Sequence, residues 1–134
     1  MPSFHDSADA QAEPEDVWKL LYDPARFPDW WAGVGTVEVG DEEGAYTMYP
    51  AGYPDFPMAQ LLDTTREQRR VTVSCLVSDL RFEWRLEPLY GGGGTRITVD
   101  VEIPDEEAAR LEAQQGAIRA SLAKLAELAA LTVD

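Results

Sequence analysis

Histidine and cysteine, the side chains that most often serve as bases, nucleophiles or metal ligands, each occur once in this sequence of 134 residues. The alternation around His5 directs Phe4 inward, so we expect His5 to face solvent. Cys75 lies in an apolar, strand-like run, which predicts a buried core thiol, because reactive thiols need an electropositive, partly exposed setting. One histidine and one cysteine do not complete a zinc site, and the acids lack the spacing of a calcium loop, so we expect no metal and no other cofactor.

Hydroxyl and carboxyl groups are the remaining candidates for chemistry. Tyr46 or Tyr49 is placed to donate a hydroxyl to a substrate oxygen, but both faces of segment 45–49 are apolar, so the inward tyrosine is left open. Asp6 would share the inward face with Phe4, where an unpaired carboxylate is costly, so either Asp6 is a pocket group or the register differs. Acid–base catalysis would need such a group within reach of the substrate, and the pattern identifies no catalytic residue.

Strand-like alternation dominates the elements that must position these groups. Segments 71–77, 81–86 and 97–103 alternate apolar and polar residues, which is typical of strands with one buried and one wet face. Charges alternate along 81–85, which suits cross-strand pairing. The run Gly91–Gly94 predicts a hairpin turn and not a phosphate loop, because no Lys-Ser/Thr follows it. Less regular strands are expected at 3–12, 36–39, 45–49 and 58–65, with a proline-rich loop at 50–57.

Helix signals occur near both ends of the sequence. Pro14, followed by two acids, predicts the start of a short helix that ends before Pro24, and a second short helix is expected from Ala25 to about Trp30. Pro104 and the acids after it predict a long helix that runs to about Leu131. The residues expected to face the sheet from this helix are Leu111, Gln115, Ile118, Leu122, Leu125 and Ala129.

The charge of the chain restricts its partners. The formal net charge is -14, from 25 acidic and 11 basic residues, and such a surface repels phosphate backbones and anionic lipid headgroups. We therefore expect no nucleic-acid partner and no stable membrane insertion. The first residues lack the basic and apolar regions of a secretion signal, and no uncharged apolar stretch approaches about 18 residues, so the expected location is the cytoplasm.

The stretch from Ala12 to Trp31 contains Ala-Glu-Pro-Glu-Asp-Val-Trp and Asp-Pro-Ala-Arg-Phe-Pro-Asp-Trp-Trp. It resembles the opening of the polyketide cyclase/dehydrase and lipid-transport proteins, which belong with START-domain and birch-pollen-allergen-like proteins in the SRPBCC superfamily. Gly94–Val99 also resembles the usual penultimate hairpin of these proteins. The resemblance implies an α+β helix-grip fold spanning 1–134 as one domain. In that fold a curved antiparallel sheet of about six to seven strands wraps a long C-terminal helix, with two short helices after the first strand.

The resemblance places a ligand between the concave sheet face and the long helix. The favoured function is binding of a small hydrophobic or aromatic molecule that is lipid- or polyketide-like. A cyclase/dehydratase acting without metal is the first alternative, and a protein-interaction module is the second. If Trp84 lines the cavity, Trp84→Ala should weaken binding more than it lowers stability. The ligand identity, turnover and oligomeric state are left open. The expected ligand-binding residues are Trp30, Trp31, Tyr46, Tyr49, Phe56, Val73, Cys75, Phe82, Trp84, Leu111, Gln115, Ile118 and Leu122, with Tyr53 also near the mouth.

Overall fold

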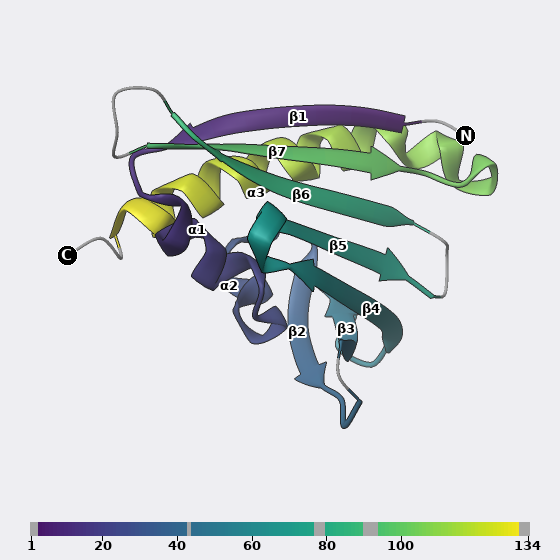
Figure 1. Cartoon of the computed structure of the whole chain (residues 1–134). Coiled ribbons are helices and arrows are strands. Elements are labelled where there is room, and N and C mark those ends of the chain that lie inside the picture. The colour runs from purple at the N-terminus through teal and green to yellow at the C-terminus, as the bar shows by residue number, and fades with distance from the viewer. Residues whose placement is uncertain (1–2, 43, 77–79, 90–93, 132–134) are drawn as a thin grey trace.

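The computed structural model describes residues 3–42, 44–76, 80–89 and 94–131, which form one antiparallel sheet and a set of helices (Figure 1). The strands are β1 (Ser3–Ala10), β2 (Val34–Val39), β3 (Ala45–Pro50), β4 (Met58–Thr65), β5 (Arg70–Cys75), β6 (Arg81–Pro88) and β7 (Thr95–Glu102). The α-helices are α1 (Pro14–Leu21), α2 (Phe27–Trp30) and α3 (Leu111–Leu131), and short 3-10 helices cover Pro24–Arg26, Arg66–Gln68 and Asp105–Arg110.

The sheet follows a simple order, β1-β7-β6-β5-β4-β3-β2, in which every neighbouring pair is antiparallel. Strands β2 to β7 follow one another along the chain, and β1 joins the far edge by pairing with β7 from Ser3↔Glu102 to Ala10↔Thr95. The curved sheet, the long C-terminal helix and the short helices after β1 make a helix-grip fold, so the predicted fold is confirmed. The turn expected at Gly91–Gly94 lies mostly outside the described residues.

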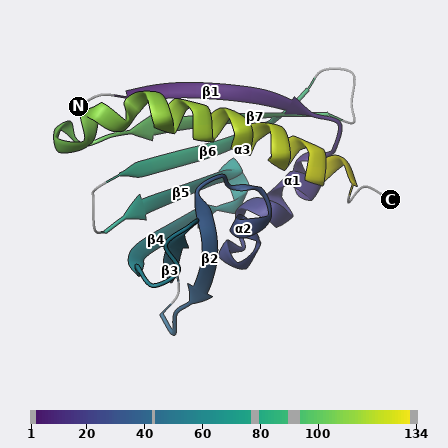
Figure 2. The ribbon, with the colours of Figure 1, turned by 180° about the vertical axis from the view of Figure 1, so that it is seen from behind.

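The three α-helices cover different parts of the concave face of the sheet. Figure 2 shows α3 running along β1 and β7, while α1 and α2 close the end of the sheet near the C-terminus. The start of the long helix differs from the prediction, because Asp105–Arg110 forms a 3-10 helix and the α-helix begins only at Leu111. In the described part of the chain, no helix is both long enough and apolar enough to span a membrane.

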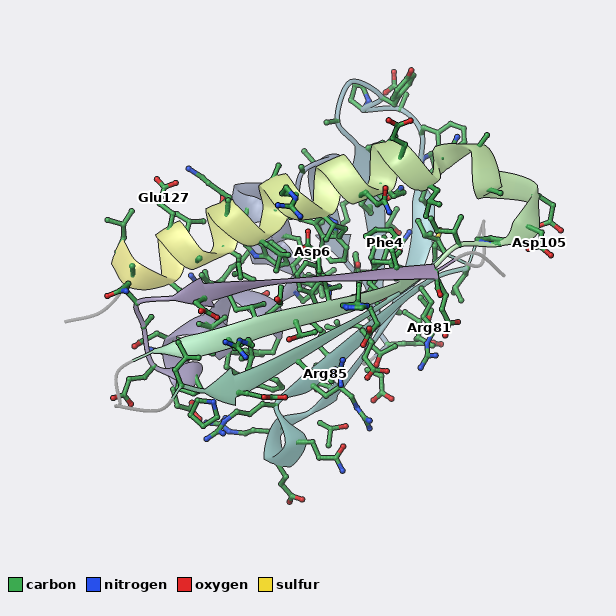
Figure 3. The ribbon with its side chains drawn as sticks, turned by 90° about the horizontal axis from the view of Figure 1, so that it is seen from above. Phe4, Asp6, Arg81, Arg85, Asp105 and Glu127 are labelled. Atoms are coloured by element: carbon green, nitrogen blue, oxygen red, sulfur yellow. The ribbon has the colours of Figure 1, made fainter. Side chains whose placement is uncertain are left out.

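The convex face of the sheet is a charged surface that faces away from α3. Arg85 pairs with Asp100 across β6 and β7, and Arg81 lies 3.6 Å from Glu102 on the same two strands. Figure 3 shows Arg81 and Arg85 on the side of the sheet opposite to α3. The expected cross-strand pairing along 81–85 is therefore confirmed, and it accounts for the polar positions of that alternation.

A buried hydroxyl fastens the aromatic segment after α2 to the long helix. Ser121 of α3 is fully buried, and its Oγ accepts a hydrogen bond of 2.8 Å from the backbone N–H of Ala32. The same hydroxyl donates to the carbonyl of Ala117 at 2.7 Å, one turn earlier in the helix. This link sets where the chain leaves α2, and it therefore sets the position of Trp31.

We expect Ser121→Ala to lower the free energy of unfolding by about 1–2 kcal/mol, because the N–H of Ala32 would lose its partner while still partly buried. Urea unfolding followed by circular dichroism measures this loss. Ser7→Ala removes an exposed hydroxyl from β1 and is the matched control, with no measurable change expected. Equal stability of wild type and Ser121→Ala would show that this link does not hold the segment.

Candidate functional site

A cavity of about 170 Å³ lies between the first turns of α3 and the strands β3 to β6. It occurs there because α3 covers the β1 side of the concave face and the short helices cover one end, which leaves part of the sheet without a helix above it. Apolar side chains make up most of its wall, as is usual for small-molecule sites. The apolar lining residues are Trp31, Ala32, Val34, Met48, Pro50, Met58, Val73, Leu80 and Phe82.

Three polar side chains from the sheet also reach the cavity wall. Tyr46, Gln60 and Cys75 come from β3, β4 and β5, and each is more than nine-tenths buried. The amide nitrogen of Gln60 donates to Cys75 Sγ at 3.3 Å and lies 3.4 Å from the carbonyl oxygen of Met58. The register pairs Tyr46 with Gln60 and Gln60 with Cys75, so the three form a row across adjacent strands.

Tyr46 is a hydrogen-bond donor without a protein acceptor. Burial raises the pKa of its hydroxyl well above the ordinary value of about 10, and the nearby Cys75 adds to the shift. The hydroxyl therefore stays protonated at physiological pH. Within the described residues it makes no hydrogen bond, and the side chain is only 5% exposed and lines the cavity. A ligand oxygen in the cavity would satisfy this group.

Trp31 joins the cavity to the core. Its ring meets Phe82 edge-on at a centroid distance of 4.9 Å, and the two rings form adjacent parts of the cavity wall. Behind them, Phe27 contacts Trp31 at 5.1 Å and Tyr46 at 5.7 Å in edge-to-face geometry. Gly33 then turns the chain toward β2 with a φ of 95°, a conformation that glycine adopts without a steric penalty. These contacts hold the aromatic wall in one orientation.

The helix side of the cavity contributes different chemistry. Arg110 ends the 3-10 helix and Gln114 lies in the first turn of α3, and both line the cavity. Their spacing of four residues puts them on one side of the helical segment. Arg110 is exposed and Gln114 is half-buried, so the guanidinium lies at the solvent edge and the amide lies deeper. Among the lining residues that the structure describes, Arg110 alone carries a charge.

The structure brings together five of the residues expected from sequence: Trp31, Tyr46, Val73, Cys75 and Phe82 all line this cavity. It also settles the open choice on β3, where Tyr46 points inward and Tyr49 lies on the outer face. Tyr49 has a raised pKa through desolvation and through the charge and hydrogen bond of Glu38 on the neighbouring strand. His5 is exposed, as expected.

Several expected residues belong to the core instead. The ring nitrogen of Trp30 donates to the carbonyl of Leu20 at 3.0 Å, and Trp84 packs edge-on against Trp30 at 5.1 Å. Period-2 alternation correctly put Trp84 on the concave face, but it does not tell which end of a strand lies beneath the short helices. The residues of α3 that were expected at the ligand and are instead absent from the cavity wall are Leu111, Ile118 and Leu122.

Two further expectations about orientation, for Gln115 and Phe56, are wrong. Gln115 is exposed and faces a surface groove between α3 and β1, whereas its neighbour Gln114 reaches the cavity. At about 100° per residue, the buried face of α3 is centred on Ile118, Leu125 and Ala129, and Gln114 lies closer to that centre than Gln115. Phe56 is 56% exposed, because the proline-rich loop turns its side chain outward.

Asp6 is placed neither in the cavity nor free in solvent. Its carboxylate lies 3.4 Å from Arg119 of α3, and Figure 3 shows it on the strand edge that faces the helix. This ion pair compensates the partly buried charge. It explains why an acid lies on the same strand face as Phe4 and Ala8.

Two other hollows occur on the surface of the described chain. One, of about 350 Å³, lies between β1 and α3 around Asp6 and Arg119. The other, of about 480 Å³, lies at the end of the sheet near Tyr22 and Leu62. Neither combines buried polar groups with aromatic walls as the cavity at Trp31 does.

Sequence reasoning missed Gln60, Arg110 and Gln114. A signal for Gln60 was present in the sequence. Gln60 lies two residues from both Met58 and Leu62, so it points to the same inward face of the strand as these apolar residues. Arg110 and Gln114 had no comparable signal, because they precede and begin the regular part of α3. Among the described residues, no group of three or more histidine, cysteine or acidic side chains lies together in a way that could hold a metal ion.

Comparison with protein families finds a match to the family described as polyketide cyclase/dehydrase and lipid transport, over residues 1–130. The chain belongs to this family. The match spans nearly the full sequence, so it includes the strands, the short helices and most of α3, and with them every residue of the cavity wall. Comparison with curated proteins finds no match.

Several solved structures share the fold of this chain. The Streptomyces aromatase/cyclase Zhui is 16% identical, with a TM-score of 0.79 and coverage of 96% of this chain and 93% of that protein. The di-domain aromatase/cyclase BexL gives the same score and identity over 95% of this chain and 46% of that protein. XoxI from Bacillus cereus is 17% identical, with a TM-score of 0.78 and coverage of 95% and 94%. At such identities the likeness concerns the fold.

Proposed function

We propose that this protein binds a small, largely apolar or aromatic molecule that carries an oxygen acceptor, in the cavity between the sheet and the start of α3. The observation that carries the proposal is the Tyr46 hydroxyl, a neutral donor on a buried side chain that lines the cavity beside the aromatic rings of Trp31 and Phe82. Membership of a family of polyketide cyclases and lipid carriers supports a ligand-binding role. The apolar walls would supply affinity, and Tyr46 would orient the bound oxygen.

A cyclase- or dehydratase-type reaction is the second candidate function. The structural likeness of this chain to the aromatase/cyclases Zhui and BexL supports it. Acid–base chemistry needs a proton acceptor near the substrate. In the described cavity wall the titratable groups are Tyr46, Cys75 and Arg110, and the wall contains no carboxylate or histidine. Tyr46 could polarise a carbonyl by donating to it, but its raised pKa makes it a poor base at neutral pH. We therefore favour binding over turnover.

Acetophenone, an aromatic ring with one carbonyl, is a suitable probe for this proposal. We expect it to bind wild type and to slow alkylation of Cys75 by N-ethylmaleimide, because Cys75 lines the cavity and is the chain's one cysteine. Tyr46→Phe should weaken binding about fivefold, which corresponds to one hydrogen bond of about 1 kcal/mol. Tryptophan fluorescence, to which Trp31 contributes from the cavity wall, measures the affinity.

Tyr49→Phe is the matched control, because it removes the same hydroxyl from the outer face of the same strand. It should bind acetophenone as wild type does. Equal weakening in both variants would place the effect outside the cavity. If acetophenone neither quenches fluorescence nor protects Cys75, the binding proposal fails for this class of molecule.

A further inference from the structure

We infer that the preferred occupant of the cavity is an aromatic acid with a single ring, its carboxylate held by Arg110 and Gln114. This inference rests on the proposed function and narrows it to a substrate class. It concerns the helix side of the cavity, whereas the proposed function depends on the Tyr46 hydroxyl on the sheet side.

The charge at the cavity rim favours an anionic ligand. Acidic residues outnumber basic ones by 25 to 11 in this chain, yet Arg110 is the charged side chain among the described lining residues. If charged residues were placed at the rim in proportion to their numbers in the chain, a carboxylate would occur there more often than a guanidinium group. Because the net charge of -14 opposes the approach of any anion, selectivity for an acid must come from a local donor such as this one.

The donor groups of Arg110 and Gln114 suit the two oxygens of a carboxylate. The guanidinium group offers several N–H donors in a plane, which suits the two oxygens of a carboxylate. Gln114 lies one helical turn further along the same side and adds an amide N–H donor from a half-buried position. Arg110 itself is exposed, so a carboxylate beside it would keep part of its hydration while the ring enters the apolar interior.

The size of the cavity suits a single aromatic ring. The cavity volume of about 170 Å³ is close to that of an engineered apolar cavity of about 150 Å³ that binds benzene. Ligand sites for larger molecules usually exceed about 300 Å³. Trp31 and Phe82 offer ring faces and edges for one aromatic ring, and a fused second ring would have to displace them or remain in solvent.

Three probes test the inference on the full chain: benzoate, its neutral analogue benzamide, and 2-naphthoate. We expect benzoate to bind more tightly than benzamide, and Arg110→Gln to reduce benzoate affinity about fivefold while leaving benzamide affinity unchanged. The loss should shrink at high salt, because Arg110 is exposed. We expect 2-naphthoate to bind more weakly than benzoate, although its larger apolar surface alone would favour it.

Arg119→Gln is the control, since it makes the same charge change on the same helix but faces β1 and Asp6. It should retain wild-type affinity for benzoate. Equal affinities for benzoate and benzamide, or equal losses in the two arginine variants, would overturn the acid assignment, and tighter binding of 2-naphthoate would overturn the single-ring assignment. In these cases acetophenone binding and its Tyr46 dependence would still stand, so failure of this inference is distinguishable from failure of the proposed function.

Discussion

Replacing Trp84 with alanine should lower the free energy of unfolding by about 3–5 kcal/mol, the range for a large aromatic side chain removed from a core. Trp84 is fully buried and packs edge-on against Trp30 at 5.1 Å and Trp31 at 5.2 Å. Its loss would leave a void under the aromatic wall that nearby strands cannot close without changing register. Urea unfolding at neutral pH measures the change.

The expectation that Trp84→Ala weakens binding more than stability applied only if Trp84 lined the cavity, and Trp84 is absent from the cavity wall. Trp84→Phe is the matched control, and it should cost clearly less, because the ring nitrogen of Trp84 has no hydrogen-bond partner among the described residues. Its cost would come from lost volume alone. A loss below about 1 kcal/mol in Trp84→Ala would mean that the core around Trp84 is far more adaptable than a close-packed interior should be.

Raising the pH above about 10 should destabilise the protein through Tyr46. Its folded-state pKa is raised by burial and by Cys75, so the folded state holds this proton after the unfolded chain has released it. The stabilisation is therefore fully present below the unfolded pKa of about 10 and is lost as the pH rises toward the folded value. One such group changes the free energy of unfolding by up to about 1.4 kcal/mol per pH unit, or about 3 kcal/mol over two units.

Urea unfolding of wild type and Tyr46→Phe at pH values from 8 to about 12 isolates this effect, because other alkaline groups contribute equally to both proteins. Wild type should lose more stability with rising pH than Tyr46→Phe. Tyr53→Phe removes the hydroxyl of a 67% exposed ring and should follow wild type. Parallel curves for wild type and Tyr46→Phe would show that Tyr46 is hydrated in the folded protein, and its role as a buried donor would lose support.

The preference for binding over catalysis depends on what the cavity wall contains. Tyr46, Gln60, Gln114 and Arg110 all carry hydrogen-bond donor groups, so the described wall offers donors for ligand oxygens at several points. Donors of this kind fix the orientation of a ligand and stabilise negative charge on it. They do not remove protons from a substrate, which a dehydratase requires.

The fold was readable from local patterns. Period-2 alternation at 71–75, 81–86 and 97–102 specified strands with one buried face, since a strand directs successive side chains to opposite sides. Pro14 and Asp23-Pro24 marked the short helical segments, and Asp23 caps the 3-10 helix Pro24–Arg26 by accepting from the N–H of Ala25 at 3.1 Å. Such signals depend only on residues a few positions apart, so they can be recognised from the sequence alone.

The site needed the tertiary structure. Alternation placed Trp84 and Phe82 on the same face, but only the docking of α1 and α2 decides that Trp84 is covered and Phe82 borders a cavity. The sequence did not tell whether Tyr46 or Tyr49 points inward, because both faces of segment 45–49 are apolar. The pairing of β3 with β2 and β4 decides that Tyr46 points inward.

Sequence by itself thus determined the strands, the approximate positions of the helices, their order and the family, because these depend on local periodicity and on motifs within short segments. Tertiary structure decided which residues face the cavity, that Gln114 and not Gln115 reaches it, and that Arg110 stands at its edge. Those features depend on how far each helix covers the sheet, and coverage is set by contacts between residues distant in the chain, such as Ser121 with Ala32.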